Sequence, residues 1–142
     1  MTDGLVQFLR DRLDEDYEVA RLTLGPNVMA RVRRGDPAPR WVPSPEGDAG
    51  IWDSDGTPRV KFVWARERDH IMRHDPARVL REVEAKRQLL ALHEPGTQEY
   101  VDGDVCMACT LQGDGPYYPC ATLRLLTLPY ADHPDYRPEW RP

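Results

Sequence analysis

The stretch Cys106-Met107-Ala108-Cys109 (CMAC), followed by Cys120 after ten intervening residues, decides how the C-terminal part of the chain folds. Two thiolates two residues apart on a tight turn can bind one tetrahedral Zn²⁺. Cys120 stands where a helix is expected to begin, and the free N–H groups and positive dipole end of a helix N-terminus suit a thiolate ligand. We therefore predict a structural zinc site that uses all three cysteines.

Three cysteines leave one position of a tetrahedral site to be filled. His93 is the first candidate, because it lies at the end of a long predicted helix and toward the apolar face of that helix. His133 and a water molecule are the alternatives. The predicted ligand set is His93, Cys106, Cys109 and Cys120. Such a set is closed, so the zinc is expected to be structural and to tie the long helix to the last one.

Other chemistry fits the cysteines less well. The plainest alternative is three reduced, partly buried thiols with a surface histidine nearby. A redox Cys-x-x-Cys follows a strand of a thioredoxin-like unit, and the pattern of this chain predicts no such unit. A zinc deaminase needs His-x-Glu and Pro-Cys-x-x-Cys, whereas here Glu94 follows His93 directly and Cys120 has no second cysteine at the required offset.

The composition indicates one globular domain. The chain has 142 residues, 40% of them hydrophobic, which is enough for a core, while 14 prolines and 10 glycines predict long irregular stretches. The N-terminal residues lack the basic and apolar regions of a signal peptide. No apolar run approaches the roughly 20 residues that span a bilayer. We therefore expect a single domain over residues 1–142, located in the cytoplasm and without a membrane partner.

Hydrophobic periodicity and turn residues predict the order of the elements. The predicted elements are a helix over 5–21, a strand over 27–33, a loop over 35–50 with a short edge piece at 41–42, strands over 51–52 and 60–64 around an Asp-Gly turn, and helices over 66–74, 76–93 and 121–128. Asp75 and Pro76 are the expected N-cap and first position of the helix to His93. Pro95-Gly96 is expected to stop that helix and start a loop.

The predicted fold class is α+β: an N-terminal helix, a small antiparallel sheet, a broken long helix and a zinc-stapled segment at about residues 93–128. Prolines recur through the tail, residues 129–142, and exclude regular structure there. The tyrosines of the tail and Trp140 are expected to wrap the domain itself, with docking on a partner as the alternative.

His70 and His74 are four residues apart on a predicted helix, the spacing at which two imidazoles can share a metal. Glu67 and Asp69 are near them in the sequence. The zincin pattern needs a glutamate directly after the first histidine, where this chain has Ile71. A solvated polar face is therefore the favoured interpretation of this pair.

Basic residues concentrate in residues 59–87, which carry nine Lys and Arg against five Asp and Glu, although the net charge of the chain is −5. The basic helices could follow a phosphate backbone. Their acidic neighbours at Glu67, Asp69, Glu82 and Glu84 indicate a surface laced with salt bridges instead. Nucleic acid is therefore not the favoured partner.

Residues 70–87 (HIMRHDPARVLREVEAKR), the Cys-x-x-Cys and residues 125–140 (LLTLPYADHPDYRPEW) resemble a family of small uncharacterised actinobacterial and actinophage proteins, classed as a domain of unknown function. The resemblance covers nearly the whole chain. It implies a cytoplasmic bacterial or phage setting, and it carries over no catalytic or binding residues.

Three functions follow from these features. The first is a non-enzymatic protein-interaction or regulatory module, in which zinc holds the fold and a protein partner of unknown identity is bound. The second is a nucleic-acid-binding regulator that uses the basic segment 59–87. The third is a metal-dependent enzyme that uses His70 and His74 or an open zinc position. No phosphate loop, nucleophile triad or paired-carboxylate motif supports the third, so an enzyme is not favoured.

Overall fold

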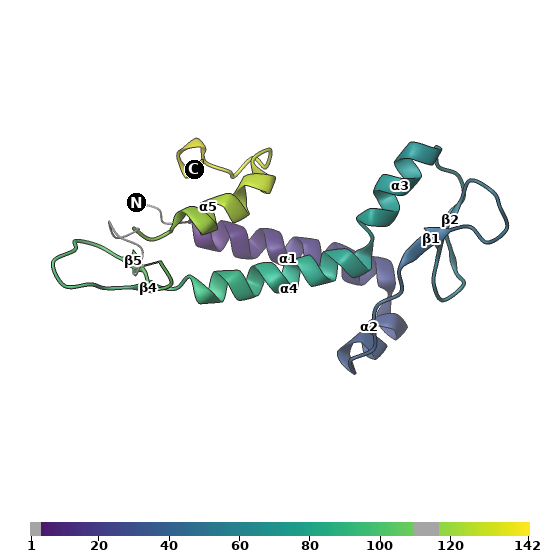
Figure 1. Cartoon of the computed structure of the whole chain (residues 1–142), viewed down its shortest axis with the longest axis horizontal. Coiled ribbons are helices and arrows are strands. Elements are labelled where there is room, and N and C mark those ends of the chain that lie inside the picture. The colour runs from purple at the N-terminus through teal and green to yellow at the C-terminus, as the bar shows by residue number, and fades with distance from the viewer. Residues whose placement is uncertain (1–3, 110–116) are drawn as a thin grey trace. The chain divides into compact units, whose positions relative to one another are not determined.

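The computed structural model describes residues 4–109 and 117–142 and consists of helices and two small antiparallel sheets (Figure 1). This confirms the α+β class. The elements are α1 (Leu5–Leu24), α2 (Pro26–Arg33), β1 (Trp41–Pro43), β2 (Ile51–Asp53), β3 (Pro58–Val60), α3 (Ala65–Arg73), α4 (Pro76–Leu92), β4 (Pro95–Gly96), β5 (Val105–Cys106), α5 (Ala121–Thr127) and the 3₁₀ turns η1 (Leu128–Tyr130) and η2 (Pro138–Trp140).

The chain divides into two compact units. The first unit contains residues 1–15 and 83–142, and the second unit contains residues 16–82. Both α1 and α4 contribute one part to each unit, because a boundary falls within each of these helices. A division by contacts does not test independent folding, so the single domain stays a prediction.

The core of the first unit lies where the start of α1 runs beside the end of α4 (Figure 1). Leucines at spacings of four residues on α1 (Leu5, Leu9 and Leu13) are fully buried. Leu123 of α5 is fully buried as well. At the edge of this core Arg87 of α4 donates to Asp14 of α1 at 2.8 Å. The apolar stripe predicted for the N-terminal helix is thus the face that this unit buries.

The C-terminal tail packs around Phe8 of α1, as the wrapping interpretation predicted. The ring of Phe8 has its centroid 5.1 Å from that of Trp140 and 6.0 Å from that of Tyr136, and both tail residues are buried. The tail holds only 3₁₀ turns, at η1 and η2. α5 ends at Thr127, and Pro129 sits in the first turn of η1, where its missing N–H is not needed.

The second unit contains a three-stranded sheet with β2 in the centre. Both neighbours run antiparallel to β2, with Trp41 of β1 opposite Asp53 and Val60 of β3 opposite Ile51. The expected edge piece at residues 41–42 is therefore confirmed as β1. The expected Asp-Gly turn is also present, because Asp53 accepts the backbone N–H of Gly56 at 3.0 Å.

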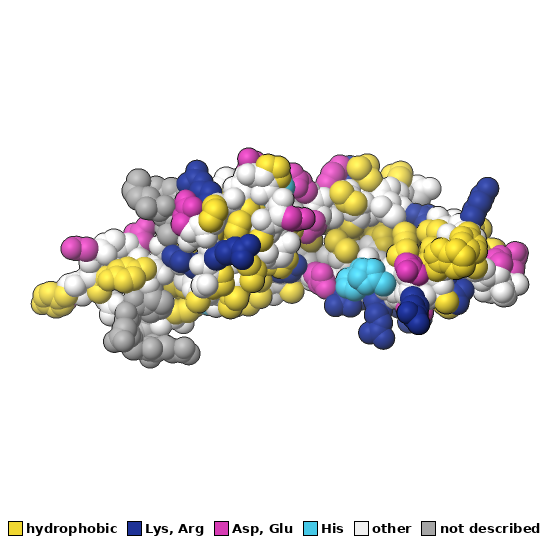
Figure 2. All heavy atoms as spheres, turned by 90° about the horizontal axis from the view of Figure 1, so that it is seen from above, with side chains coloured by type: hydrophobic (Ala, Val, Ile, Leu, Met, Phe, Trp, Pro, Cys, Tyr) yellow, Lys and Arg dark blue, Asp and Glu magenta, His cyan; other side chains and the backbone are white. Residues whose placement is uncertain are grey.

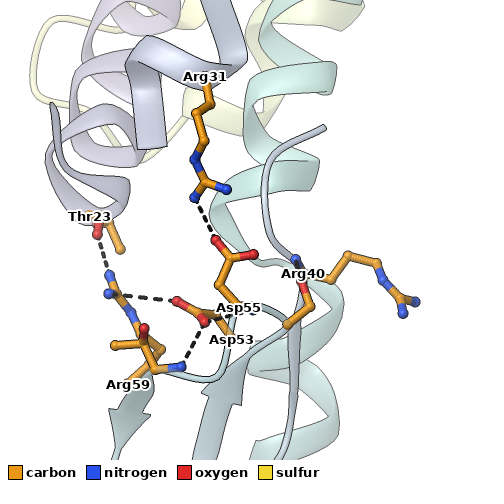
Figure 3. Close-up of polar contacts among 8 residues, drawn as sticks. Thr23, Arg31, Arg40, Asp53, Asp55 and Arg59 are labelled. Atoms are coloured by element: carbon orange, nitrogen blue, oxygen red, sulfur yellow. Dashed lines mark hydrogen bonds and ion pairs between the residues drawn. The ribbon is translucent and has the colours of Figure 1, made fainter. Parts of the chain in front are cut away.

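Asp53 organises the turn between β2 and β3 (Figure 3). Its carboxylate is buried and accepts the backbone N–H groups of Asp55 and Thr57, each at 3.0 Å. Arg59 reaches the same carboxylate at 3.9 Å and also donates to the carbonyl oxygen of Thr23 at the end of α1. These contacts hold the hairpin against the last turns of α1 by hydrogen bonds to a charged group, which are stronger than neutral ones.

Residues 27–33 form helix α2, so the strand predicted there is wrong. The alternating Val28, Ala30 and Val32 suggested a strand, but Pro26 occupies the first helical turn, where its fixed φ favours a helix. Gly25 precedes it with a φ of +85°, a conformation that lets the chain turn sharply out of α1. Helical spacing buries Met29, whereas a strand would have placed it on the opposite side from the valines.

The third strand also differs from its prediction. β3 covers Pro58–Val60 rather than residues 60–64, because β2 begins at Ile51 and offers no partner beyond Val60. Residues 61–64 connect the sheet to α3 and are not part of a strand. Pro95–Gly96, predicted to open a loop, instead pairs with Val105–Cys106.

Asp75 caps α4 and joins it to the sheet within the second unit. One carboxylate oxygen accepts the backbone N–H of Arg78 at 2.9 Å, as the predicted N-cap requires. The other oxygen accepts the backbone N–H of Trp41 in β1 at 3.0 Å. The side chain is buried, so both donors depend on it.

We expect Asp75→Ala to lower the free energy of unfolding by about 2 kcal/mol, because it removes a helix cap and leaves the N–H of Trp41 without its acceptor. Urea denaturation followed by circular dichroism measures this loss. Asp36→Ala, a matched change at an exposed aspartate of the same unit, is expected to have little effect. Equal losses in the two variants would contradict the role given to Asp75.

Candidate metal centre

One histidine and three cysteines come together in the first unit. His93 directly follows α4, Cys106 ends β5, Cys109 lies in the next turn and Cys120 is the N-cap of α5. The four predicted ligands therefore come from three segments that are separated in the sequence. Cys106 and Cys120 are buried, while Cys109 and His93 are half-buried, and all three cysteines are free thiols.

The ligand atoms are arranged as a four-coordinate site requires. Nδ1 of His93 lies 3.3 Å from Sγ of Cys106, 3.6 Å from Sγ of Cys109 and 3.3 Å from Sγ of Cys120. All four ligand atoms lie within 4.8 Å of one another. In a tetrahedron with bonds of roughly 2.0–2.3 Å, a sulfur and a nitrogen ligand are about 3.5 Å apart. The four residues could therefore hold one metal ion.

The β4–β5 ladder brings the end of α4 to the Cys-x-x-Cys turn. Pro95 pairs with Cys106, and the backbone N–H of Met107 donates to the carbonyl oxygen of Glu94 at 3.0 Å. The turn itself closes through the N–H of Cys109 and the carbonyl oxygen of Cys106 at 3.2 Å. Because only Glu94 separates His93 from the ladder, the His93 imidazole reaches the thiols.

A second set of backbone contacts brings Cys120 to the same place. Val105 of β5 forms an isolated antiparallel bridge with Tyr117, and the N–H of Tyr118 donates to the carbonyl oxygen of Asp104 at 3.0 Å. From there the chain reaches Cys120, whose carbonyl oxygen accepts the N–H of Arg124 in the first turn of α5. The helix start predicted at Cys120 is therefore confirmed.

Gly96 gives the β4–β5 pair room for a side chain of the turn. A Cβ at position 96 would lie 2.1 Å from Sδ of Met107, so any larger residue must displace that side chain. Pro95-Gly96 indicates only a helix stop and a loop in the sequence, so this close approach was not predicted. A glycine three residues after His93 and opposite a Cys-x-x-Cys is the signal that could have indicated it.

Burial and the neighbouring sulfurs keep a proton on Cys109. Desolvation, followed by the hydrogen bond to Cys106 and the charge of Cys120, raises the pKa of the Cys109 thiol from 9.0 to about 11. Burial also raises the pKa of the nearby Tyr118 hydroxyl. A thiol that stays protonated beside other sulfurs becomes a thiolate ligand when a metal cation displaces its proton.

The alternative ligand His133 lies away from this cluster. Its Nδ1 is 3.2 Å from a guanidinium nitrogen of Arg12 and accepts the backbone N–H of Asp135 at 3.1 Å. His133 also packs against Phe8, with ring centroids 5.4 Å apart. The tail histidine thus belongs to the contact between the tail and α1.

His70 lies on α3 and His74 is the C-cap residue of that helix, with their ring centroids 4.4 Å apart. Both rings are exposed, and Nδ1 of His74 is 2.9 Å from the carbonyl oxygen of His70. Among the residues described, they are not part of a cluster of three or more metal-ligating groups. A solvated polar face remains the interpretation of this pair.

One protein family matches nearly the whole chain. The model of DUF6221, a family of unknown function, matches residues 2–142. This chain belongs to that family. No curated protein and no solved structure matches the chain. The four converging residues are therefore the feature of this DUF6221 chain that points to a function.

Within the described part of the DUF6221 chain, no helix is both long enough and apolar enough to cross a membrane.

We expect metal binding to release a proton from Cys109 and to strengthen as the pH rises. The pKa of about 11 leaves this thiol protonated at pH 7, so a metal must displace that proton, and a lower proton concentration favours the exchange. Calorimetric titration with Zn²⁺ in two buffers of different ionisation enthalpy counts the protons released.

In Cys109→Ser the released protons should fall by about one, and the slope of log affinity against pH should fall by about one. The matched variant His133→Ala should release as many protons as the parent chain. An unchanged proton count in Cys109→Ser would contradict ligation through this sulfur.

Proposed function

We propose that this DUF6221 chain is a zinc-stapled, non-enzymatic interaction module. The observation that carries the proposal is the approach of one imidazole nitrogen and three sulfurs to one another at 3.3–3.6 Å. A set of soft sulfur ligands with one imidazole favours Zn²⁺ over the hard cations Mg²⁺ and Ca²⁺, which prefer oxygen ligands.

Four protein ligands support a structural role for the zinc. A catalytic zinc keeps three protein ligands and leaves one position for water or substrate. Here His93 occupies the place that such an open position would need, at a distance from the sulfurs equal to that of a bound ligand. Two of the cysteines are also buried, which shields the site from solvent.

Metal binding would add to the packing that orders several short segments. The ladder between β4 and β5 has two residues on each side, and α5 has only seven residues. Strand pairs and helices of this length are marginal in water without further contacts. One zinc ion would connect the end of α4, the β4–β5 ladder and the start of α5, so its binding energy would become folding energy for this part.

The free thiols are also relevant to the cellular compartment of the protein. Thiolate ligands stay reduced in the cytoplasm, whereas an oxidising compartment favours disulfides. We propose a cytoplasmic location on this basis, and the resemblance noted from the sequence adds a bacterial or phage setting. With zinc assigned to the fold, the biological activity would come from exposed surfaces that bind a partner or regulator.

Zinc content tests the proposal. Protein produced without a histidine tag should contain one zinc per chain by mass spectrometry of metals, and Cys120→Ser and His93→Ala should each lose most of it, because each removes one of four ligands. His133→Ala and His70→Ala are matched controls that should keep the zinc.

Hydrogen exchange separates a structural zinc from a catalytic one. Chelation should abolish protection of the backbone amides in β4, β5 and α5, while the β1–β3 sheet of the second unit keeps its protection. Protein purified without any metal, or a His93→Ala variant that retains zinc and its affinity, would overturn the closed structural site.

A further inference from the structure

We propose that the second unit binds single-stranded nucleic acid on a surface formed by Phe62, Trp64, Lys61, Arg66 and Arg73, called here the aromatic–basic surface. This inference names a partner for the interaction role proposed above and rests on that role, but it does not rest on the zinc. The whole surface lies within residues 61–73 and therefore within one compact unit.

The aromatic side chains of Phe62 and Trp64 are exposed to solvent and lie next to each other. Trp64 is 72% exposed and Phe62 is 59% exposed, and their ring centroids are 5.2 Å apart in an edge-to-face arrangement. The other three tryptophans are buried or half-buried. An exposed aromatic pair is costly in water and is typical of a binding site rather than of a plain surface.

The backbone that carries the pair is fixed. The N–H of Val63 donates to the carbonyl oxygen of Ala49 at 2.9 Å, and Val63 is half-buried between its two exposed neighbours. A Cβ at Gly50 would lie 2.8 Å from the carbonyl oxygen of Val60, so only glycine lets the two segments approach this closely. Phe62 and Trp64 thus lie next to each other on an anchored segment, as preorganised binding groups do.

Cations continue the surface along α3. Arg66 and Arg73 are seven residues apart with Asp69 and His70 between them at helical spacing, and all four are exposed. The opposite side of α3, which carries Ile71 and Met72, is half-buried. On the face drawn in Figure 2, the second unit shows hydrophobic side chains together with Lys, Arg and His side chains.

The salt bridges expected from the sequence do not form on α3. Lys61, Arg66 and Arg73 make no ion pair within the described part of the chain. Of the acidic neighbours, Glu82 pairs with Arg78 on α4 at 2.8 Å. The reason for disfavouring nucleic acid was that such pairs would consume the cations, and on the aromatic–basic surface they do not.

Aromatic faces beside free cations match the chemistry of an unpaired nucleic acid strand. Every base can stack on an exposed indole, and cations at helical spacing can neutralise the phosphates. A duplex hides its base faces, so it would use only the cations. An acidic protein segment would use the cations without stacking a base on Trp64.

Binding of a twelve-nucleotide oligothymidylate to the full-length chain tests this proposal. We expect quenching of tryptophan fluorescence on binding, and weaker binding of the matching duplex. Trp64→Ala should weaken oligothymidylate binding roughly 5- to 150-fold, the range that loss of one stacked base contact gives. An oligouridylate of the same length shows whether RNA or DNA is preferred.

Salt dependence tests the cations separately. Three phosphate contacts predict that log affinity falls with log salt with a slope of about −2, and Arg66→Ala with Arg73→Ala should remove roughly two thirds of that slope. The paired substitution Arg33→Ala with Arg34→Ala removes two exposed cations elsewhere in the same unit and should leave binding unchanged. Tyr100→Ala, at a side chain that is 95% exposed in the first unit, is the aromatic control.

Four outcomes would overturn the proposal: no binding of either oligonucleotide at low salt, unchanged binding in Trp64→Ala, equal binding of the duplex, or equal binding of polyglutamate without fluorescence quenching. The last would identify the surface as a site for an acidic protein segment. Zinc content is measured on every variant. Zinc-loaded protein that binds no strand refutes this inference alone, and zinc-free protein that binds a strand refutes the structural site alone.

Discussion

The convergence of one imidazole nitrogen and three thiol sulfurs is the constraint on which the first unit depends. These atoms come from the end of α4, from the β5 turn and from the start of α5, and they lie within 4.8 Å of one another. The β4–β5 ladder and α5 are too short to be stable alone. The local backbone contacts around the cluster, such as Met107 to Glu94 and Tyr118 to Asp104, bring these segments together.

The convergence of the four residues was predictable because its signals are local. Cys106 and Cys109 show their shared turn by spacing alone, and Cys120 and His93 lie at helix boundaries that apolar periodicity and proline mark. The helices α1, α3 and α4 were predictable for the same reason. Asp75 before Pro76 even indicated the cap that the structure contains.

Two of the failures concern contacts between distant residues, and one concerns a local signal. The alternation in residues 27–33 fits a strand, but Pro26 starts a helix there and Met29 is buried. β3 ends at Val60 because β2 begins at Ile51, and the residues of β3 alone do not indicate this limit. Pro95–Gly96 has the sequence of a helix stop, and it forms a strand because Val105–Cys106 pairs with it. Strand pairing depends on the partner more than on local propensity.

The first unit is assembled from both ends of the chain, and this affects how the protein is made. Phe8 is made before Tyr136 and Trp140, which cover it. The part of α1 that they cover therefore stays open to water until residues 136–140 have been made. A nascent chain with such an exposed apolar surface is prone to aggregation. The contact that covers Phe8 in this DUF6221 chain therefore closes only after Trp140 has been made.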